Sequence, residues 1–235
     1  MKFVLDTHCH TVASGHAYST VQEIAKEASN RGLELIAITD HAETLPGGAH
    51  LFHFHNLIVI PRKLYGVEIL RGAEVNILDF EGHVDLEEET LEHLDIVIAS
   101  FHPPCITPGN IVENTNALIK VIQNPHIDII VHPGDPRYPI DIKAVVEAAK
   151  EYGTLLEINN TSLKPDSFRA GGTDTVRDII KECIRKDMPF IIGSDAHISF
   201  DVGNFNHVEK LIEELEVPEH LIVNTSVDLL KSFLA

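Results

Sequence analysis

The chain has 235 residues and carries 36 acidic against 18 basic side chains, a formal net charge of -18 with histidine neutral. Its 44% hydrophobic and 23% charged composition is that of a folded globular protein, which excludes a disordered chain. The negative charge disfavours nucleic acid and anionic membranes as partners. Histidine is unusually frequent, with 15 residues, and tryptophan is absent.

The sequence predicts neither a membrane span nor a secretion signal. The longest apolar runs, such as residues 128–132, are far too short to cross a bilayer. Asp6 ends the first apolar run too early for a signal peptide. Cys9, Cys105 and Cys183 show no CxxC spacing and make no disulfide framework. We therefore expect a protein of the reducing cytoplasm.

Short apolar runs alternate with longer amphipathic segments along the chain. The apolar runs predict seven buried strands, at residues 2–6, 35–39, 69–75, 95–100, 127–131, 154–158 and 189–192. A capping box at Thr20–Glu23 opens the first helix, and Gly32 closes it. Further helices are predicted at residues 111–122, 141–152 and 174–186. A weaker pair of elements follows at residues 221–223 and 227–233.

This alternation predicts a parallel sheet with right-handed crossovers. Successive strand ends are separated by about 30 residues, the length of one βαβ step. Seven such steps favour a closed or nearly closed barrel over an open sheet, and no glycine-rich phosphate loop follows any strand. Because no linker or low-complexity stretch interrupts the pattern, we expect a single domain spanning residues 1–235.

Polar residues gather where the predicted strands end. The histidines and acids at or near these ends are His8, His10, His16, His41, Glu74, His102, His132, Asp195 and His197. In a parallel barrel the carboxyl ends of all strands meet at one face. A histidine at one strand end is usually a structural hydrogen-bonding group, but seven histidines and two carboxylates are more ligands than one tetrahedral ion can use. The pattern therefore predicts two or three metal ions with a bridging carboxylate.

The other histidines and Cys9 have simpler interpretations. Five histidines in helical or loop contexts are predicted to lie on the surface: His83, His93, His126, His207 and His220. Residues 50–55, which contain three more histidines, are predicted to form either a mobile lid or a packed surface loop. Cys9 lies between two proposed ligands and should point away from them as a buried, inert thiol.

These strand-end residues resemble the motifs of the PHP (polymerase and histidinol phosphatase) superfamily, in particular its stand-alone YcdX-like phosphatase branch. The matching stretches are residues 6–10, 39–41, 72–74, 101–102, 132–134, 156–160 and 193–197. The resemblance implies an α/β fold of the TIM-barrel type, a distorted (β/α)7 barrel, which agrees with the seven predicted strands. A ring-forming homo-oligomer would also fit the resemblance.

The resemblance implies a trinuclear site made of nine ligands. The first ion would be held by His8, His10, Glu74 and Asp195. The second would share Glu74 and add His102 and His132. The third would be held by His16, His41 and His197. Zinc is the first expectation because the site is rich in imidazole, although manganese and iron also fit mixed histidine and carboxylate ligands.

Clustered divalent ions suit the hydrolysis of a small phosphomonoester, since they offset charge on the phosphoryl oxygens and activate water near neutral pH. Asp195 could also orient the attacking water. Candidates for binding phosphate or substrate are Arg137, Lys164 and Arg169, each of which could instead be a solvent-facing loop cation. Three acids beside the ligands could hydrogen-bond imidazole N–H groups: Asp6, Asp40 and Glu157. Glu157 lies within the sixth predicted strand and could equally have a structural role.

Two other functions compete with a phosphomonoesterase. A phosphodiesterase or 3′-5′ exonuclease would also fit the superfamily, but the acidic composition and the lack of a basic stripe disfavour a long polyanionic strand. A metal-storing or metal-sensing protein without turnover is the third function, and a site open at a barrel mouth disfavours it, because non-catalytic metal shells are usually closed.

Overall fold

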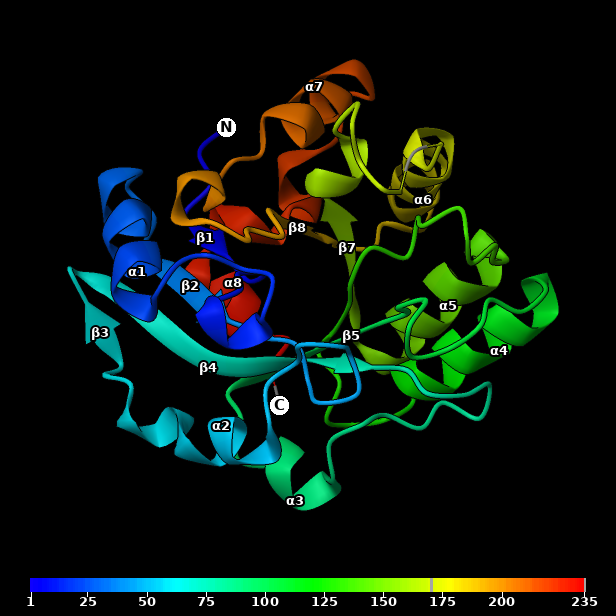
Figure 1. Ribbon diagram of the computed structural model, residues 1–235. Coiled ribbons are helices and arrows are strands. Elements are labelled where there is room, and N and C mark those ends of the chain that lie inside the picture. Colours follow the sequence, from blue (N-terminus) through cyan, green and yellow to red (C-terminus); the bar gives the residue numbers. More distant parts are fainter. Residues whose placement is uncertain (170, 235) are drawn as a thin grey trace.

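The computed structural model, which describes residues 1–169 and 171–234, is a nearly closed parallel barrel (Figure 1). Within these residues, seven parallel strands follow the order β1-β2-β4-β5-β6-β7-β8, and β3 pairs antiparallel with β4. The bounds are β1 Leu5–Asp6, β2 Leu35–Ile38, β3 Lys63–Leu64, β4 Val67–Asn76, β5 Ile96–Ser100, β6 Ile129–Ile130, β7 Leu155–Asn159 and β8 Ile191–Gly193. The predicted fold class and its seven parallel strands are confirmed, whereas β3 was not predicted.

Helices surround the strands in Figure 1. Their bounds are α1 Val21–Asn30, α2 Leu51–Asn56, α3 Glu88–Leu91, α4 Ile111–Ile122, α5 Ile142–Tyr152, α6 Thr173–Lys186, α7 Asn206–Glu214 and α8 Val227–Lys231. The predicted capping box of α1 is confirmed, because the Thr20 side chain accepts from the Glu23 N–H and the Glu23 carboxylate accepts from the Thr20 N–H. Gly32 follows that helix with a φ of 74°, as a residue that ends a helix in the left-handed region does.

Two predicted segments take other conformations. Residues 50–55 were expected to be a loop, but they form α2, because the His50 imidazole accepts from the Phe52 N–H and Phe54 is buried. The segment at 221–223 does not extend a ladder. Its two ends belong to short 3-10 turns, Glu219–Leu221 and Val223–Thr225, and Ile222 between them forms one isolated bridge with Phe190.

The gap between the first and last strands is closed by side-chain and loop contacts rather than by a ladder. At the carboxyl side of the strands, Cys9 forms a single parallel bridge with Ala196. Further down, the buried Asn224 amide accepts from the Ile192 N–H at 2.7 Å and donates to the carbonyls of Ile192 at 2.8 Å and Leu5 at 3.1 Å. This one side chain therefore satisfies backbone groups of both edge strands.

Replacing Asn224 with leucine is expected to lower the free energy of unfolding by roughly 2–5 kcal/mol, because it leaves backbone groups of Leu5 and Ile192 buried without partners. The measurement is urea unfolding at unchanged m-value. Asn206→Ala, at an exposed position in α7, is the control and should stay within about 0.5 kcal/mol. A similarly small loss for Asn224→Leu would show that the barrel closes without this amide.

The two ends of the barrel differ. The lower interior is filled by strand residues such as Leu5, Leu35 and Ile129, which cluster with Leu230 of α8. The opposite end, at the carboxyl ends of the strands, carries the buried polar side chains. None of the helices in the described part of the chain has the length and apolar character of a membrane span.

Candidate metal centre at the carboxyl ends of the strands

The predicted ligands converge on one carboxylate, that of Glu74 near the end of β4, which is fully buried. Nε2 of His8 and Nε2 of His10 each lie 3.4 Å from Oε2 of Glu74. On its other side, Oε1 lies 3.5 Å from Nε2 of His102 and 3.1 Å from Nε2 of His132. Glu74 therefore occupies the bridging position that the sequence assigns to a carboxylate.

Asp195, which follows β8, faces the same two histidines from the opposite direction. Its Oδ1 lies 3.6 Å from Nε2 of His8 and 3.5 Å from Nε2 of His10. Two histidines and two carboxylates thus surround one point, in the combination expected for the first ion. Residues up to 187 positions apart in the sequence meet here, because β1 and β8 are the two edge strands at which the barrel closes.

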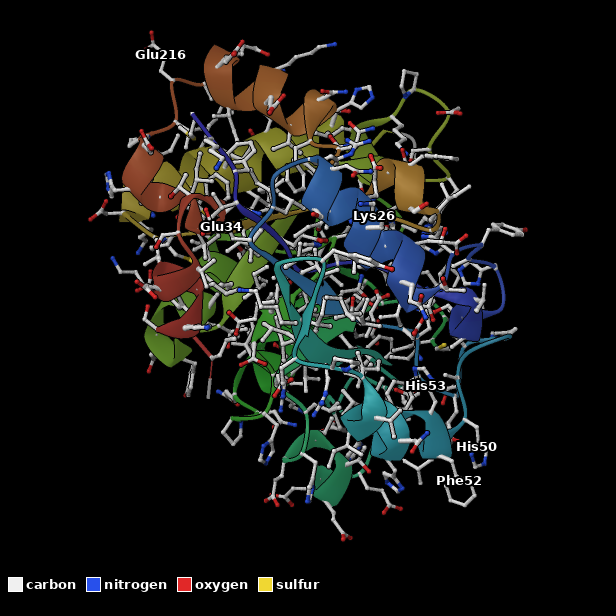
Figure 2. The ribbon with its side chains drawn as sticks, turned by 90° about the vertical axis from the view of Figure 1, so that its left-hand side faces the viewer. Lys26, Glu34, His50, Phe52, His53 and Glu216 are labelled. Carbon is white, nitrogen blue, oxygen red and sulfur yellow. The ribbon has the colours of Figure 1, made fainter. Side chains whose placement is uncertain are left out.

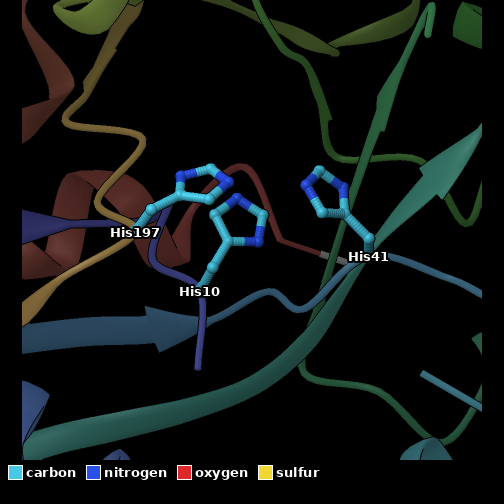
Figure 3. Close-up of side chains that lie close together, drawn as sticks. All are labelled: His10, His41 and His197. Atoms are coloured by element: carbon cyan, nitrogen blue, oxygen red, sulfur yellow. The ribbon is translucent and has the colours of Figure 1, made fainter. Parts of the chain in front are cut away.

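The remaining histidines stack at the mouth of the barrel. The ring of His16 lies 5.1 Å from that of His41 and 4.8 Å from that of His197, measured between centroids. Figure 3 shows the rings of His41 and His197 together with that of His10. Nδ1 of His41 also lies 2.8 Å from Glu74 Oε2. The nine predicted ligands therefore form one cluster. The residues expected to hold the third ion adjoin those expected to hold the first.

Hydrogen bonds to Nδ1 orient two of the imidazoles. Nδ1 of His8 lies 2.7 Å from Oε1 of Glu157. Nδ1 of His102 lies 2.7 Å from Oδ1 of Asn76, whose amide nitrogen donates to Asp85 at 2.6 Å. Nδ1 of each ring therefore carries a proton, and Nε2 of each ring is turned toward Glu74. The predicted role of Glu157 is confirmed, whereas Asn76 and Asp85 were not predicted.

The two other acids that were candidates for imidazole partners do not contact the proposed ligand rings. Asp6 accepts from the backbone N–H groups of His8, Ser194 and Gly203, so it holds chain segments rather than a ring. Asp40 accepts from Thr11 and Ser14 instead of from a ligand imidazole. Both carboxylates are fully buried.

The protonation states and donor set fit divalent cations. Burial, together with the neighbouring His41 and His197, lowers the pKa of His10 to about 3, so its imidazole is neutral at pH 7. Burial alone would raise the pKa of Glu74, but the imidazoles around it bring that pKa well below its usual range. Nε2 of His10 is buried without a hydrogen-bond partner. Neutral imidazoles and ionised carboxylates are ligands for zinc, manganese and iron.

Backbone strain accompanies this arrangement. His132 and Asp195 have φ angles of 38° and 56°, in the left-handed region that non-glycine residues rarely adopt. Glu157 holds His132 in place by accepting its backbone N–H at 2.8 Å. At Gly193 a Cβ would lie 1.8 Å from Oε1 of Glu157, so only glycine leaves room for that carboxylate. No local sequence pattern indicates these conformations.

A cavity of about 740 Å³ opens over the cluster. Its lining includes the polar side chains His16, His41, His102, Asp195 and His197 and the apolar side chains Leu45, Pro46, Pro103, Pro104 and Phe168. The three predicted substrate-binding cations, Arg137, Lys164 and Arg169, all line it as well. The cavity therefore combines a cluster of histidines with apolar and cationic side chains.

The three cations differ in their surroundings. Arg137 pairs with Asp135 at 2.5 Å and Lys164 with Asp201 at 2.9 Å, both partly exposed. Arg169 is only 3% exposed, so the alternative of a solvent-facing cation is wrong for this residue. Its Nη1 donates to Oδ2 of Asp195 at 3.0 Å, whereas its Nε has no hydrogen-bond partner.

The residues predicted to lie outside the site do so. His83 and His220 are exposed and pair with Asp79 and Asp187, and His93 is exposed as well, whereas His126 and His207 are partly buried. Cys9 is fully buried, and burial raises the pKa of its thiol well above the usual range, as expected of an inert side chain.

The fold and the site together define a parallel α/β barrel with a histidine- and carboxylate-rich site at the carboxyl ends of its strands. The profile of the PHP domain family matches residues 6–161, and the chain belongs to this family. A probable phosphatase of Acetivibrio thermocellus is 52% identical over 228 residues, which are 97% of this chain and 93% of that protein. A probable phosphatase of Caldanaerobacter subterraneus is 53% identical, over 100% of this chain and 92% of its own length.

A solved structure of another protein has the same fold. The histidinol phosphate phosphatase of Lactococcus lactis, solved with zinc, L-histidinol and phosphate, superposes with a TM-score of 0.63. It is 21% identical, and the match covers 89% of this chain and 92% of that one. This likeness shows the fold. The family match and the curated relatives confirm the predicted family, and the chain is a hydrolase of phosphoric esters.

Proposed function

We propose that the protein hydrolyses small phosphomonoesters with the help of three divalent ions, zinc first among them. The nine residues that would hold the ions are His8, His10, His16, His41, Glu74, His102, His132, Asp195 and His197. The observation that carries the proposal is the convergence of imidazole nitrogens on both oxygens of the buried Glu74. One chain supplies all nine side chains, so a homo-oligomer is not needed to complete the site.

When bound, such ions supply Lewis-acid charge for the phosphoryl oxygens and for the activation of water. The side chains of the protein orient the reactants around them. Asp195 is the proposed catalytic residue, because its Oδ1 faces His8 and His10 while its Oδ2 is held by Arg169. A carboxylate fixed in this way can accept a hydrogen bond from the attacking water and direct a lone pair at phosphorus.

Arg169 is the strongest candidate for gripping the phosphate. Its guanidinium lies beside Asp195, lines the cavity, and keeps one donor, Nε, without a partner. Arg137 and Lys164 are proposed to attract the substrate from the cavity wall, although each is already paired with an acid. The apolar side chains Leu45, Pro46 and Phe168 would receive the organic part of a small substrate.

The cavity size and the charge favour a small substrate over a nucleic-acid strand. A volume of about 740 Å³ accommodates one small molecule, and the net charge of -18 opposes a polyanion. Three free cysteines accord with the reducing cytoplasm, which we propose as the location.

The test compares two chromogenic substrates on protein that has been stripped with chelator and reloaded with zinc or manganese. We expect two or three ions per chain by elemental analysis, faster turnover of p-nitrophenyl phosphate than of bis-p-nitrophenyl phosphate, and loss of activity on stripping. Faster cleavage of the diester would instead support a phosphodiesterase. Ion binding without turnover of either substrate would support a metal-storing protein, and fewer than two ions would refute the multinuclear site.

A further inference from the structure

A buried serine hydroxyl lies between His10 and a carboxylate that is not itself a proposed ligand. Ser14 ends a 3-10 turn at Val12–Ser14, and its Oγ lies 3.3 Å from Nδ1 of His10. The same oxygen lies 2.6 Å from Oδ1 of Asp40 and accepts the backbone N–H of His41 at 3.1 Å. The side chains of His10, Ser14 and Asp40 are all 0% exposed, so water does not compete for these contacts.

The donors around Asp40 fix the direction of each hydrogen bond. Its Oδ1 also accepts the Thr11 N–H at 2.7 Å, and its Oδ2 accepts the Thr11 hydroxyl at 2.7 Å. A carboxylate surrounded by donors is an acceptor, so the single hydroxyl proton of Ser14 points at Asp40. With the His41 N–H on one lone pair, Ser14 offers only its other lone pair to His10. Nδ1 of His10 must then be the donor.

We propose that Ser14 and Asp40 are positioning residues, which hold His10 in the tautomer with its proton on Nδ1. The Nε2 lone pair of His10 then faces Glu74 and Asp195, at 3.4 and 3.5 Å from their nearest oxygens. Both distances exceed those of ordinary N–H···O bonds, and Nε2 has no hydrogen-bond partner. This inference rests on the proposed role of His10 as a ligand and extends it to the residues that prepare the ligand.

Helix α2 lies on the outer side of the Ser14–Asp40 pair. Nε2 of His53 lies 3.2 Å from Oδ2 of Asp40, the oxygen that does not contact Ser14. In Figure 2, His50 and Phe52 lie at the outer edge of α2, and His53 lies nearer the body of the molecule. The side chain of His53 is 27% exposed. The His53 ring approaches Asp40 at Oδ2 and not at Oδ1, so its removal leaves the Ser14–Oδ1 bond in place and provides a matched control.

The experiment combines a tautomer measurement with a metal titration. In metal-free protein at neutral pH, long-range ¹H–¹⁵N NMR should show His10 protonated on Nδ1, with His10→Gln used to assign its signals. Ser14→Ala should remove the preference for Nδ1 and raise the dissociation constant for Zn²⁺, in at least one binding step, by about 10–100-fold. His53→Ala should leave both the tautomer and the zinc affinity within twofold of the parent protein.

Three results would overturn the inference. The first is a wild-type His10 protonated on Nε2, a result that does not depend on any Ser14 variant and so stands even if Ser14→Ala fails to fold. The second is a folded Ser14→Ala protein with unchanged zinc affinity, and the third is an equal loss in His53→Ala. Neither readout depends on turnover. A protein that binds zinc in this way but cleaves no phosphoester would therefore refute the proposed function and leave the tautomer assignment standing.

Discussion

Replacing Glu74 with glutamine is expected to lower kcat/KM for p-nitrophenyl phosphate by on the order of 10³-fold, which corresponds to roughly 4 kcal/mol of transition-state stabilisation. The amide has the size of the carboxylate but no charge, and its nitrogen brings protons to a position that four imidazole Nε2 atoms approach within 3.5 Å. A group that bridges two ions cannot be replaced by one that donates hydrogen bonds. The number of bound ions should fall together with the activity.

Glu68→Gln supplies the control, because it makes the same chemical change on the same strand. Glu68 lies near the start of β4, at the opposite end of the strand from Glu74, and pairs with Lys231 of α8, so its loss should change kcat/KM less than twofold. Thermal unfolding and elemental analysis of both variants separate a lost ion from a lost fold. Full activity in a folded Glu74→Gln protein would refute the bridging role and with it the proposed ligand set.

The strands and their terminal histidines could be predicted from sequence for one physical reason. Parallel strands buried on both faces leave short continuous apolar runs, such as residues 35–38 and 96–100, and the chain must turn polar where each run leaves the barrel. His41 and His102 follow these runs directly, so their convergence is a consequence of topology. The same logic identifies Glu74 and Asp195.

The residues that orient the proposed ligands or close the barrel could not be predicted in this way, because only tertiary packing brings them into place. Asn76 lies within β4 and reads as an ordinary strand residue, although its amide oxygen orients His102. Asp40 meets Ser14 across 26 residues, and Asn224 closes the barrel from a segment whose pattern favours a weak strand. Helix α2 was missed because its length of six residues is too short for helical periodicity to be distinct.

Arg169→Met is expected to weaken inhibition by inorganic phosphate and to lower kcat/KM by about 10²–10³-fold in the metal-loaded protein. The guanidinium is buried beside Asp195, and its residue lines the cavity. Its Nε lies 3.8 Å from Asp135 and has no hydrogen-bond partner, so a phosphate oxygen that reached this donor would gain a charged hydrogen bond without displacing an existing one. The substitution also leaves Asp195 without its Nη1 partner, so the loss should appear in kcat as well as in KM.

Arg137→Met separates this effect from a general loss of positive charge. Arg137 lines the same cavity, but its side chain is 33% exposed and Asp135 already occupies its guanidinium, so the change should cost less than tenfold. Arg169→Lys should recover only part of the activity, because an ammonium cannot bond Asp195 and a phosphate oxygen in the geometry of the planar guanidinium. If phosphate inhibits Arg169→Met as strongly as the parent protein, Arg169 only positions Asp195, and the phosphate is gripped elsewhere in the cavity.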